Sequence, residues 1–252
     1  MDLRPERLER IVQLLNERGG VRTNELADML GVSAATVRRD LEELAVRGAI
    51  DRTHGGAVVP HAGTAKEAPY AEKTQRMRGA KERIAYFAAG LVPDGATIVL
   101  DSGTTVLELA KRLTGRPVTA IALDLPSASA LAADAGVEVW TPGGRVRNGL
   151  FSLVGPWVEQ TLRSLSVDIF FMGADAIDGV GISNSTVEEA EVKRLALAAA
   201  KSTVLLADST KFGRRSFARV CQLQDISALI TDHGSRAALE DIDENSLRIE
   251  FV

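Results

Sequence analysis

Two groups of residues in this sequence have types and spacings that could bind a ligand: one suits a phosphate group and the other suits the bases of DNA. The first is the turn Asp101-Ser102-Gly103-Thr104-Thr105, between an apolar run at 97–100 and an amphipathic stretch that starts at residue 106. Small hydroxyl residues and a glycine at a strand-to-helix turn expose backbone N–H groups at the positive end of the helix dipole. The pattern differs from a nucleotide-binding P-loop, because no lysine follows the Gly-Thr pair. A plain helix cap by Ser102 or Thr104 is the alternative.

Other residues suited to a polyol phosphate follow further apolar runs of the C-terminal part. They are Gly144 and Arg145 after 137–141, Asp175 after 167–172, Glu191 and Lys193 behind Glu188 and Glu189 in the helical stretch 187–200, and Lys211 after 203–207. Each is a weak signal alone, because a strand-end aspartate often caps the next turn, and the alternative for Glu191 and Lys193 is a plain position on a helix surface. Ligands of parallel sheets bind beyond the carboxyl ends of the strands. We therefore expect these residues and the turn 101–105 to form one site.

The second group lies on one predicted helix near the N-terminus, which Ser33 is placed to cap. Three apolar residues have the spacing of one buried stripe: Val37, Leu41 and Leu44. The opposite face carries four residues in its first half: Ala35, Thr36, Arg38 and Arg39. Arginine can pair with guanine in the major groove, and small side chains can meet a thymine methyl, so this face is typical of a DNA-recognition helix. The alternative is that the arginines are solvated or pair with Asp40 and Glu43.

Further short elements position this helix. Apolar residues at helical spacing predict one helix before Gly19-Gly20 and a second that ends at Gly31, with Thr23 as its possible cap. Two short helices joined by a tight glycine turn are the sequence form of a helix-turn-helix. Residues 49–52 and 57–59 then predict two short strands around a glycine turn. This hairpin would be a wing, whose Arg52 and His54 could contact phosphate or the minor groove.

Strand-like and helix-like stretches alternate through the rest of the chain. Seven runs of β-branched and apolar residues predict strands: 97–100, 118–123, 137–141, 167–172, 203–207, 228–231 and 247–251. With the amphipathic stretches between several of them, they predict an α/β fold with a mostly parallel sheet. Changes in composition set the expected boundaries. They are a small N-terminal winged helix-turn-helix domain at 1–58, a linker and connecting helix at 59–83, and a larger C-terminal α/β domain at 84–252.

The composition is that of a soluble globular protein and excludes several classes. The single cysteine, Cys221, excludes an internal disulfide, and the three histidines are scattered without the spacing of a zinc site. No apolar run reaches the length of a membrane span, and the charged start does not resemble a signal peptide. We therefore expect a cytoplasmic protein that has no metal, no cofactor and no membrane contact.

The formal net charge of −4 by itself argues against DNA binding, but the charge is unevenly distributed. Residues 1–58 carry nine arginines against ten acidic residues, whereas residues 84–252 carry fifteen basic and twenty-one acidic residues. The near-neutral N-terminal part still places Arg38 and Arg39 on one half of a helix. We expect modest non-specific affinity for DNA and a shallow dependence on salt.

Both parts of the chain resemble the DeoR family of bacterial transcriptional regulators. The N-terminal resemblance rests on three motifs: Glu25-Leu26-Ala27, Val32-Ser33-Ala34-Ala35-Thr36-Val37-Arg38-Arg39-Asp40-Leu41 and Arg52-Thr53-His54-Gly55-Gly56-Ala57. The C-terminal resemblance rests on three more: the turn 101–105, Gly173-Ala174-Asp175 and Asp208-Ser209-Thr210-Lys211-Phe212-Gly213. The family has a winged helix-turn-helix and an effector domain similar in fold to ribose-5-phosphate isomerase.

The resemblance implies a repressor that is released, or otherwise switched, by a phosphorylated sugar or sugar alcohol. The expected partners are a double-stranded DNA operator and that effector. We expect a homodimer or higher homo-oligomer, because repeated half-sites suit a two-fold protein. One departure matters: the family usually has a Thr-Asn pair after the second strand of the effector domain, whereas this chain has Ala122-Leu123-Asp124. The departure leaves open whether this chain makes the usual polar contact of that asparagine and binds the usual class of effector.

Two other functions stay open at this point. An active sugar-phosphate isomerase would need a carboxylate base such as Asp175 or Glu191, with a lysine to stabilise the enediolate. The similar isomerases have a glycine-rich loop before their catalytic glutamate, whereas the segment 181–186 has a single glycine. A DNA-binding scaffold with an empty sensor domain would gain no thermal stability from any ligand.

Overall fold

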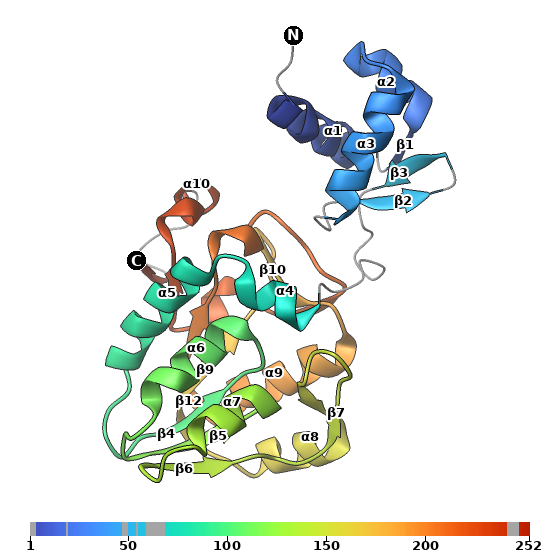
Figure 1. Ribbon diagram of the computed structural model, residues 1–252. Helices are drawn as coiled ribbons and strands as arrows, with labels where there is room; N and C mark the ends of the chain where they lie inside the picture. Colours follow the sequence, from blue (N-terminus) through green and yellow to red (C-terminus); the bar gives the residue numbers. More distant parts are fainter. Residues whose placement is uncertain (1–3, 19, 47–49, 54, 59–68, 241–246) are drawn as a thin grey trace. The chain divides into compact units, whose positions relative to one another are not determined.

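The computed structural model describes residues 4–18, 20–46, 50–53, 55–58, 69–240 and 247–252. The chain divides into two compact units, residues 1–68 and 69–252. Each unit has a hydrophobic core of its own. Figure 1 shows the helices and strands of both units.

The described residues of the N-terminal unit form three helices and a small antiparallel sheet. The helices are α1 (Arg4–Arg18), α2 (Thr23–Leu30) and α3 (Ala34–Val46), and the strands are β1 (Gly20–Arg22), β2 (Asp51–Thr53) and β3 (Gly56–Val58). Strand β3 pairs with both β1 and β2. This is the expected helix-turn-helix followed by a two-stranded wing.

The predicted stripe of α3 lies in the core of this unit. Val37, Leu41 and Leu44 are buried and belong to one cluster with apolar residues of α1 and α2. Gly31 ends α2 with a φ of 63°, a left-handed conformation that glycine adopts without steric cost. The possible cap at Thr23 is not used, because α2 begins at this residue and its side chain is buried. The Glu25 carboxylate instead accepts the N–H of the preceding Arg22 at 3.1 Å.

A parallel sheet forms the centre of the second unit. Within the described residues it has seven strands in the order β15-β14-β12-β9-β4-β5-β6. Their bounds are β4 (Thr97–Leu100), β5 (Val118–Ala122), β6 (Val137–Trp140), β9 (Val167–Gly173), β12 (Ala200–Leu206), β14 (Ala228–Thr231) and β15 (Arg248–Phe251). These are the seven runs predicted as strands. The expected α/β fold with a mostly parallel sheet is therefore confirmed.

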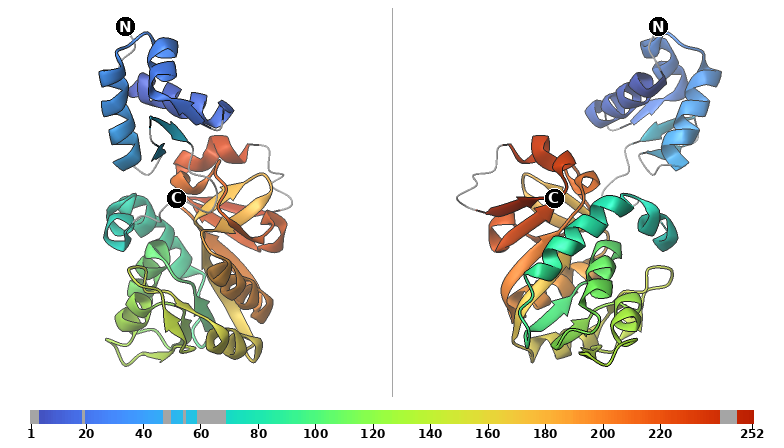
Figure 2. Two further views of the ribbon diagram at one scale, coloured as in Figure 1. Left: turned by 90° about the vertical axis from the view of Figure 1, so that its right-hand side faces the viewer. Right: turned by 60° about the vertical axis from the view of Figure 1, so that its left-hand side comes forward.

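Helices cover both faces of this sheet (Figure 2). One face packs on α5 (Arg78–Gly90), α6 (Thr104–Leu113) and α7 (Leu125–Leu131), and the other packs on α8 (Pro156–Arg163) and α9 (Val187–Ala199). Phe170 and Met172 of β9 pack with the α8–α9 layer, whereas Phe171 between them packs with the α5–α6 layer. Because both faces are covered, the strands are continuous apolar runs in the sequence.

The second unit begins with α4 (Tyr70–Gln75), within the range expected to link the two domains. Helices α4 and α5 belong to the compact unit 69–252, whereas residues 59–68 lie outside the described residues. The remaining elements are the hairpin β7 (Arg145–Val146) and β8 (Leu153–Val154), the antiparallel strands β10 (Ala176–Asp178), β11 (Gly181–Asn184) and β13 (Ala218–Cys221), and α10 (Arg236–Leu239).

Candidate functional site

Arg38 and Arg39 are exposed on α3, and neither has an ion-pair partner among the described residues. Two nearby acidic residues, Asp40 and Glu43, pair with α1. Arg7 Nε lies 2.7 Å from the Asp40 carboxylate, which is buried. The Glu43 carboxylate lies 2.5 Å from the guanidinium group of Arg4. Because α1 engages these carboxylates, both arginine side chains of α3 remain exposed.

Ser33 caps the first turn of α3, as predicted. Its Oγ accepts the Thr36 N–H at 3.1 Å and lies 2.9 Å from Thr36 Oγ1. Ala35 is exposed beside them. In the wing, Arg52 lies in β2 opposite Ala57, whereas the Arg52 side chain and the whole of His54 lie outside the described residues. The described part of the surface therefore has small side chains first and two arginines one turn later, and its contact with the major groove stays a prediction.

In the second unit, an aspartate follows the carboxyl end of each of five neighbouring strands. They are Asp101 after β4, Asp124 after β5, Asp175 after β9, Asp208 after β12 and Asp232 after β14. Asp208 and Asp232 act as turn caps, because they accept the N–H groups of Thr210 and Gly234. For these two residues the ordinary role of a strand-end aspartate applies.

Asp101 and Lys193 form a buried ion pair in which each side chain is 2% exposed. The Lys193 ammonium, from α9, also donates to the Gly173 carbonyl at 3.0 Å. The Gly173 N–H donates to the same Asp101 carboxylate at 2.8 Å. Burial raises the pKa of Asp101, and the Lys193 charge and the amide donors oppose this shift. The two predicted site residues therefore join β4, β9 and α9 to one another and do not present free groups.

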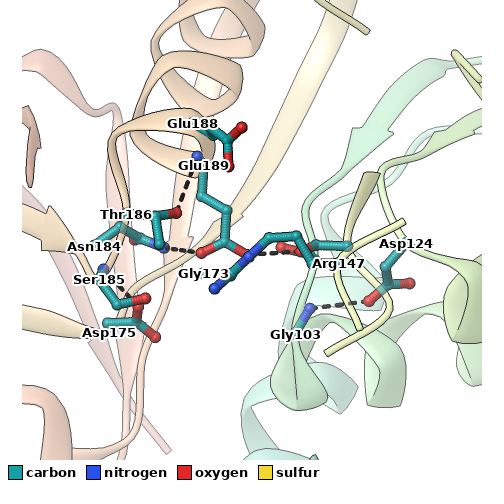
Figure 3. Close-up of polar contacts among 12 residues, drawn as sticks. Gly103, Asp124, Arg147, Gly173, Asp175, Asn184, Ser185, Thr186, Glu188 and Glu189 are labelled. Atoms are coloured by element: carbon teal, nitrogen blue, oxygen red, sulfur yellow. Dashed lines mark hydrogen bonds and ion pairs between the residues drawn. The ribbon is translucent and has the colours of Figure 1, made fainter. Parts of the chain in front are cut away.

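The turn before α6 is joined to the end of β5 (Figure 3). The Gly103 N–H donates to Asp124 Oδ2 at 3.0 Å, and the Ser127 N–H donates to Oδ1 of the same carboxylate at 2.8 Å. Asp124 is fully buried, and this burial raises the pKa of its carboxyl. Leu123 lies in the core. The aspartate that departs from the family pattern therefore caps α7 and holds the turn 101–105.

Basic side chains from α4, α5 and the loop after β12 gather at this edge of the sheet. The Lys81 ammonium and the Thr104 hydroxyl both donate to the Lys73 carbonyl, the latter at 3.3 Å. Burial lowers the pKa of Lys81 to about 8, and the Lys211 and Lys73 charges act in the same direction. Burial also lowers the pKa of Lys211. Of these four residues, only Thr104 and Lys211 are among the predicted site residues.

The Asp175 carboxylate lies near Lys73 and Lys211. It lies 3.6 Å from the Lys73 ammonium and accepts the Ser185 N–H at 3.0 Å. Burial acts to raise its pKa, but Lys73, Lys211 and Lys193 outweigh that effect and lower the pKa to about 2. The carboxylate is thus ionised at neutral pH in a predominantly cationic surrounding.

A second polar group surrounds Glu189 in the first turn of α9. Its carboxylate lies 2.6 Å from the Arg147 guanidinium, and accepts the Ser152 hydroxyl at 2.7 Å and the Asn184 amide at 3.4 Å. In Figure 3, Arg147 lies between Glu189 and the Gly103–Asp124 contact. Asn184 Oδ1 is buried and has no hydrogen-bond partner among the described residues. An unsatisfied buried acceptor calls for a missing donor.

Sequence reasoning did not select this second group. Glu189 alone carried a signal, because it opens a predicted helix together with Glu188. The other three lie on or beside β7, β8 and β11, short strands that hydrophobic periodicity does not reveal. A search for polar residues at every strand end, including the short ones, would have found Asn184.

Three predicted site residues make contacts of other kinds. Glu191 lies 2.7 Å from Arg194 on the same helix. This contact fits the alternative that Glu191 belongs to a helix surface. Arg145 is exposed and lies 2.6 Å from Glu188. Gly144 permits close packing, because a Cβ there would lie 2.7 Å from a methyl group of Val158. At the turn itself, Thr104 and Thr105 are buried and Ser102 is partly exposed.

Comparison with known proteins identifies the family. Residues 7–62 match the DeoR-like helix-turn-helix domain, and residues 76–233 match the DeoR C terminal sensor domain. The HTH-type transcriptional regulator GlpR of Haloferax volcanii is 36% identical over 90% of this chain and 89% of its own length. The lactose phosphotransferase system repressor of Staphylococcus epidermidis is 36% identical over 94% and 96%. The chain therefore belongs to the DeoR family of transcriptional regulators, as its motifs predict.

Solved structures resemble the chain only in part. A probable sor operon regulator of Shigella flexneri has 13% identity and a TM-score of 0.45 over 66% of this chain and 89% of that chain. A ribose 5-phosphate isomerase of Methanocaldococcus jannaschii has 22% identity and a TM-score of 0.39 over 53% and 54%. These likenesses are too weak to bear on function. Among the described residues, no helix is long and apolar enough to cross a membrane, and no cluster of His, Cys, Asp or Glu could hold a metal ion.

Proposed function

We propose that this regulator represses carbohydrate genes and is controlled by a phosphorylated sugar or sugar alcohol bound at the carboxyl edge of the large sheet. One observation carries the effector assignment: the ammonium groups of Lys81 and Lys211 gather near the N-terminal turn of α6, with Asp175 and Asp208 as the neighbouring carboxylates. Helix N-termini and buried ammonium groups favour a phosphate. The buried Asn184 oxygen and the ionised Asp175 can accept hydrogen bonds from ligand hydroxyls.

The DNA-binding half of the proposal rests on α3. Arg38 and Arg39 are exposed and the cap at Ser33 orders the turn before them. We expect two copies of α3, from a two-fold dimer, to enter the major groove of two half-sites of a palindromic operator. The related lactose phosphotransferase system repressor and GlpR are named for sugar and transcription control, which favours carbohydrate genes as targets.

Turnover of the effector is not part of this proposal. A general base needs a pKa near the working pH, whereas Asp175 has a pKa of about 2. Glu189 is held in an ion pair with Arg147, and Glu191 pairs with Arg194. An isomerase assay on pentose and hexose phosphates tests this point. Turnover that disappears in the Asp175→Asn variant would favour the isomerase.

The effector site is tested by a thermal-shift panel of sugar phosphates, followed by operator-binding assays with each compound that raises the melting temperature. We expect at least one to stabilise the protein and to change its affinity for the operator. Ser102→Glu should abolish both effects and leave operator affinity intact, because a fixed negative charge at the turn repels phosphate. Ser129→Glu is the matched control, since Ser129 is an exposed residue of α7. A normal response of Ser102→Glu would exclude the turn from the site.

A further inference from the structure

Helix α4 is held in place by polar contacts to the proposed effector site. It has no buried residue of its own. Its Lys73 makes two opposite kinds of contact: the backbone carbonyl accepts hydrogen bonds from Lys81 and Thr104, and the side-chain ammonium lies 3.6 Å from Asp175. In Figure 1, α4 precedes α5 and lies close to α6. Through its carbonyl, Lys73 thus engages two hydrogen-bond donors of the site, and through its ammonium it engages the Asp175 carboxylate.

The two groups that donate to the Lys73 carbonyl, the Lys81 ammonium and the Thr104 hydroxyl, are suited to bind an anion. Lys81 is 4% exposed, and no carboxylate lies within ion-pair distance of it among the described residues. A buried ammonium that has a carbonyl as its acceptor is less well stabilised than one paired with an anion. Thr104 opens α6, so its hydroxyl lies at the positive end of a helix dipole. A phosphate would satisfy both groups better than the carbonyl does.

Residues with a strained backbone and a hydroxyl without a hydrogen-bond partner lie in α4 or next to it. Met77, which joins α4 to α5, has a φ of 53°, and Phe151, whose ring packs edge-on against Tyr70 at 5.3 Å, has a φ of 65°. Both values lie in the left-handed region that favours glycine. The Tyr70 hydroxyl is buried with no hydrogen-bond partner among the described residues. Because Met77 lies just after α4 and the Tyr70 hydroxyl belongs to it, the strain at Met77 and the unsatisfied hydroxyl lower the free energy needed to release the helix.

We propose that α4 is an internal competitor of the effector, a latch that the effector displaces. The phosphate replaces the Lys73 carbonyl as the acceptor of the hydrogen bonds from Lys81 and Thr104. A ligand hydroxyl replaces the Lys73 ammonium as the partner of the Asp175 carboxylate. This inference rests on the proposed effector site. Because α4 follows directly, in sequence, the residues that lead from the DNA-binding unit, its release changes the segment through which the two units are connected. Effector binding is thereby coupled to DNA binding.

Hydrogen–deuterium exchange of the full-length protein tests the latch. The probes are inorganic phosphate, glycerol 3-phosphate and ribose 5-phosphate, each at a concentration that saturates its thermal shift. The backbone amides at 73–76, which donate within α4, should exchange about tenfold faster with a bound probe, and those of α8 should not change. Binding with unchanged or slower exchange at 73–76 would overturn the latch and leave the effector site standing. If no probe binds, the effector site fails and the latch fails with it.

Lys73→Gln gives an independent measurement, because it removes the ammonium and keeps the backbone carbonyl. It should bind inorganic phosphate about threefold more tightly than the wild type, since the competitor is weakened. Lys201→Gln is the matched control: Lys201 also pairs with an aspartate, Asp168, at the opposite edge of the sheet. Weaker phosphate binding by Lys73→Gln would make Lys73 a ligand of the phosphate and overturn the latch.

Discussion

At the scale of single residues, the environment of Arg38 and Arg39 decides what they can contact. The carboxylates of Asp40 and Glu43, on the same helix, are paired with Arg7 and Arg4 of α1. An arginine whose side chain is exposed and has no internal partner can pair with a guanine in two hydrogen bonds.

Arg38→Ala and Arg39→Ala should each weaken operator binding by about 1–3 kcal/mol. Fluorescence anisotropy with operator DNA and with random DNA of equal length measures the effect. Arg10→Ala serves as control, because Arg10 is an exposed arginine of α1. Equal losses on both DNAs would mean that the arginines contact phosphates and do not read the sequence.

The Asp175 carboxylate should also make the free energy of unfolding depend on pH. Its pKa of about 2 lies below the ordinary value of 3.8, because lysines surround it. Its contribution to the free energy of unfolding is therefore present above about pH 4 and is lost as the pH falls towards 2. The difference in stability between the wild type and Asp175→Asn should shrink by about 2 kcal/mol over this range. Urea unfolding at several pH values measures this difference, and Asp28→Asn, at an exposed residue of the other unit, controls for the loss of a charge. A constant difference would contradict the assignment.

At the scale of elements, α3 depends on its cap. The Ser33 hydroxyl accepts the Thr36 N–H at 3.1 Å, one of the N–H groups that a helix start leaves without a partner. Ser33→Ala should lower the free energy of unfolding of the N-terminal unit by about 1 kcal/mol, whereas Ser33→Asn should keep most of it. Chemical denaturation followed by circular dichroism measures both variants. Equal stability of the two would show that the cap does not stabilise the helix.

The second unit uses its elements differently. Helix α9 supplies Lys193 to the end of β4 and Glu189 to the second polar group, so one helix supports both sides of the proposed site. Helix α6 starts at the turn that Asp124 holds. The strand ends are thereby fixed by internal hydrogen bonds, whereas α4 has no buried residue. This contrast makes α4 the element expected to move.

At the scale of the whole molecule, the two units have separate cores and separate proposed ligands. We expect two transitions in differential scanning calorimetry. A sugar phosphate at 100 times its Kd should stabilise only the C-terminal unit, by about 2.7 kcal/mol, and operator DNA should stabilise the N-terminal unit. A single transition that shifts with either ligand would mean that the units unfold together.

The sequence by itself determined the elements and the family. All seven strands of the large sheet, the stripe of α3 and the turn 101–105 follow from local patterns, because burial of one face or of both faces sets the spacing of apolar residues. The motifs at 32–41 and 101–105 lie within the regions that match the DeoR domains. The two arginines that the sequence places on the outer face of α3 are exposed.

Only the tertiary structure decided which polar residues at the carboxyl edge of the sheet are enclosed and which lie at the proposed site. Lys193 is enclosed with Asp101, Glu191 pairs on the helix surface, and Lys73 and Lys81, from the range expected to be a linker, lie at the site. Thr104 contacts a residue 31 positions away, and Lys193 one 92 positions away. Such contacts depend on the order of the strands and on the way helices pack across them, which local spacing does not encode.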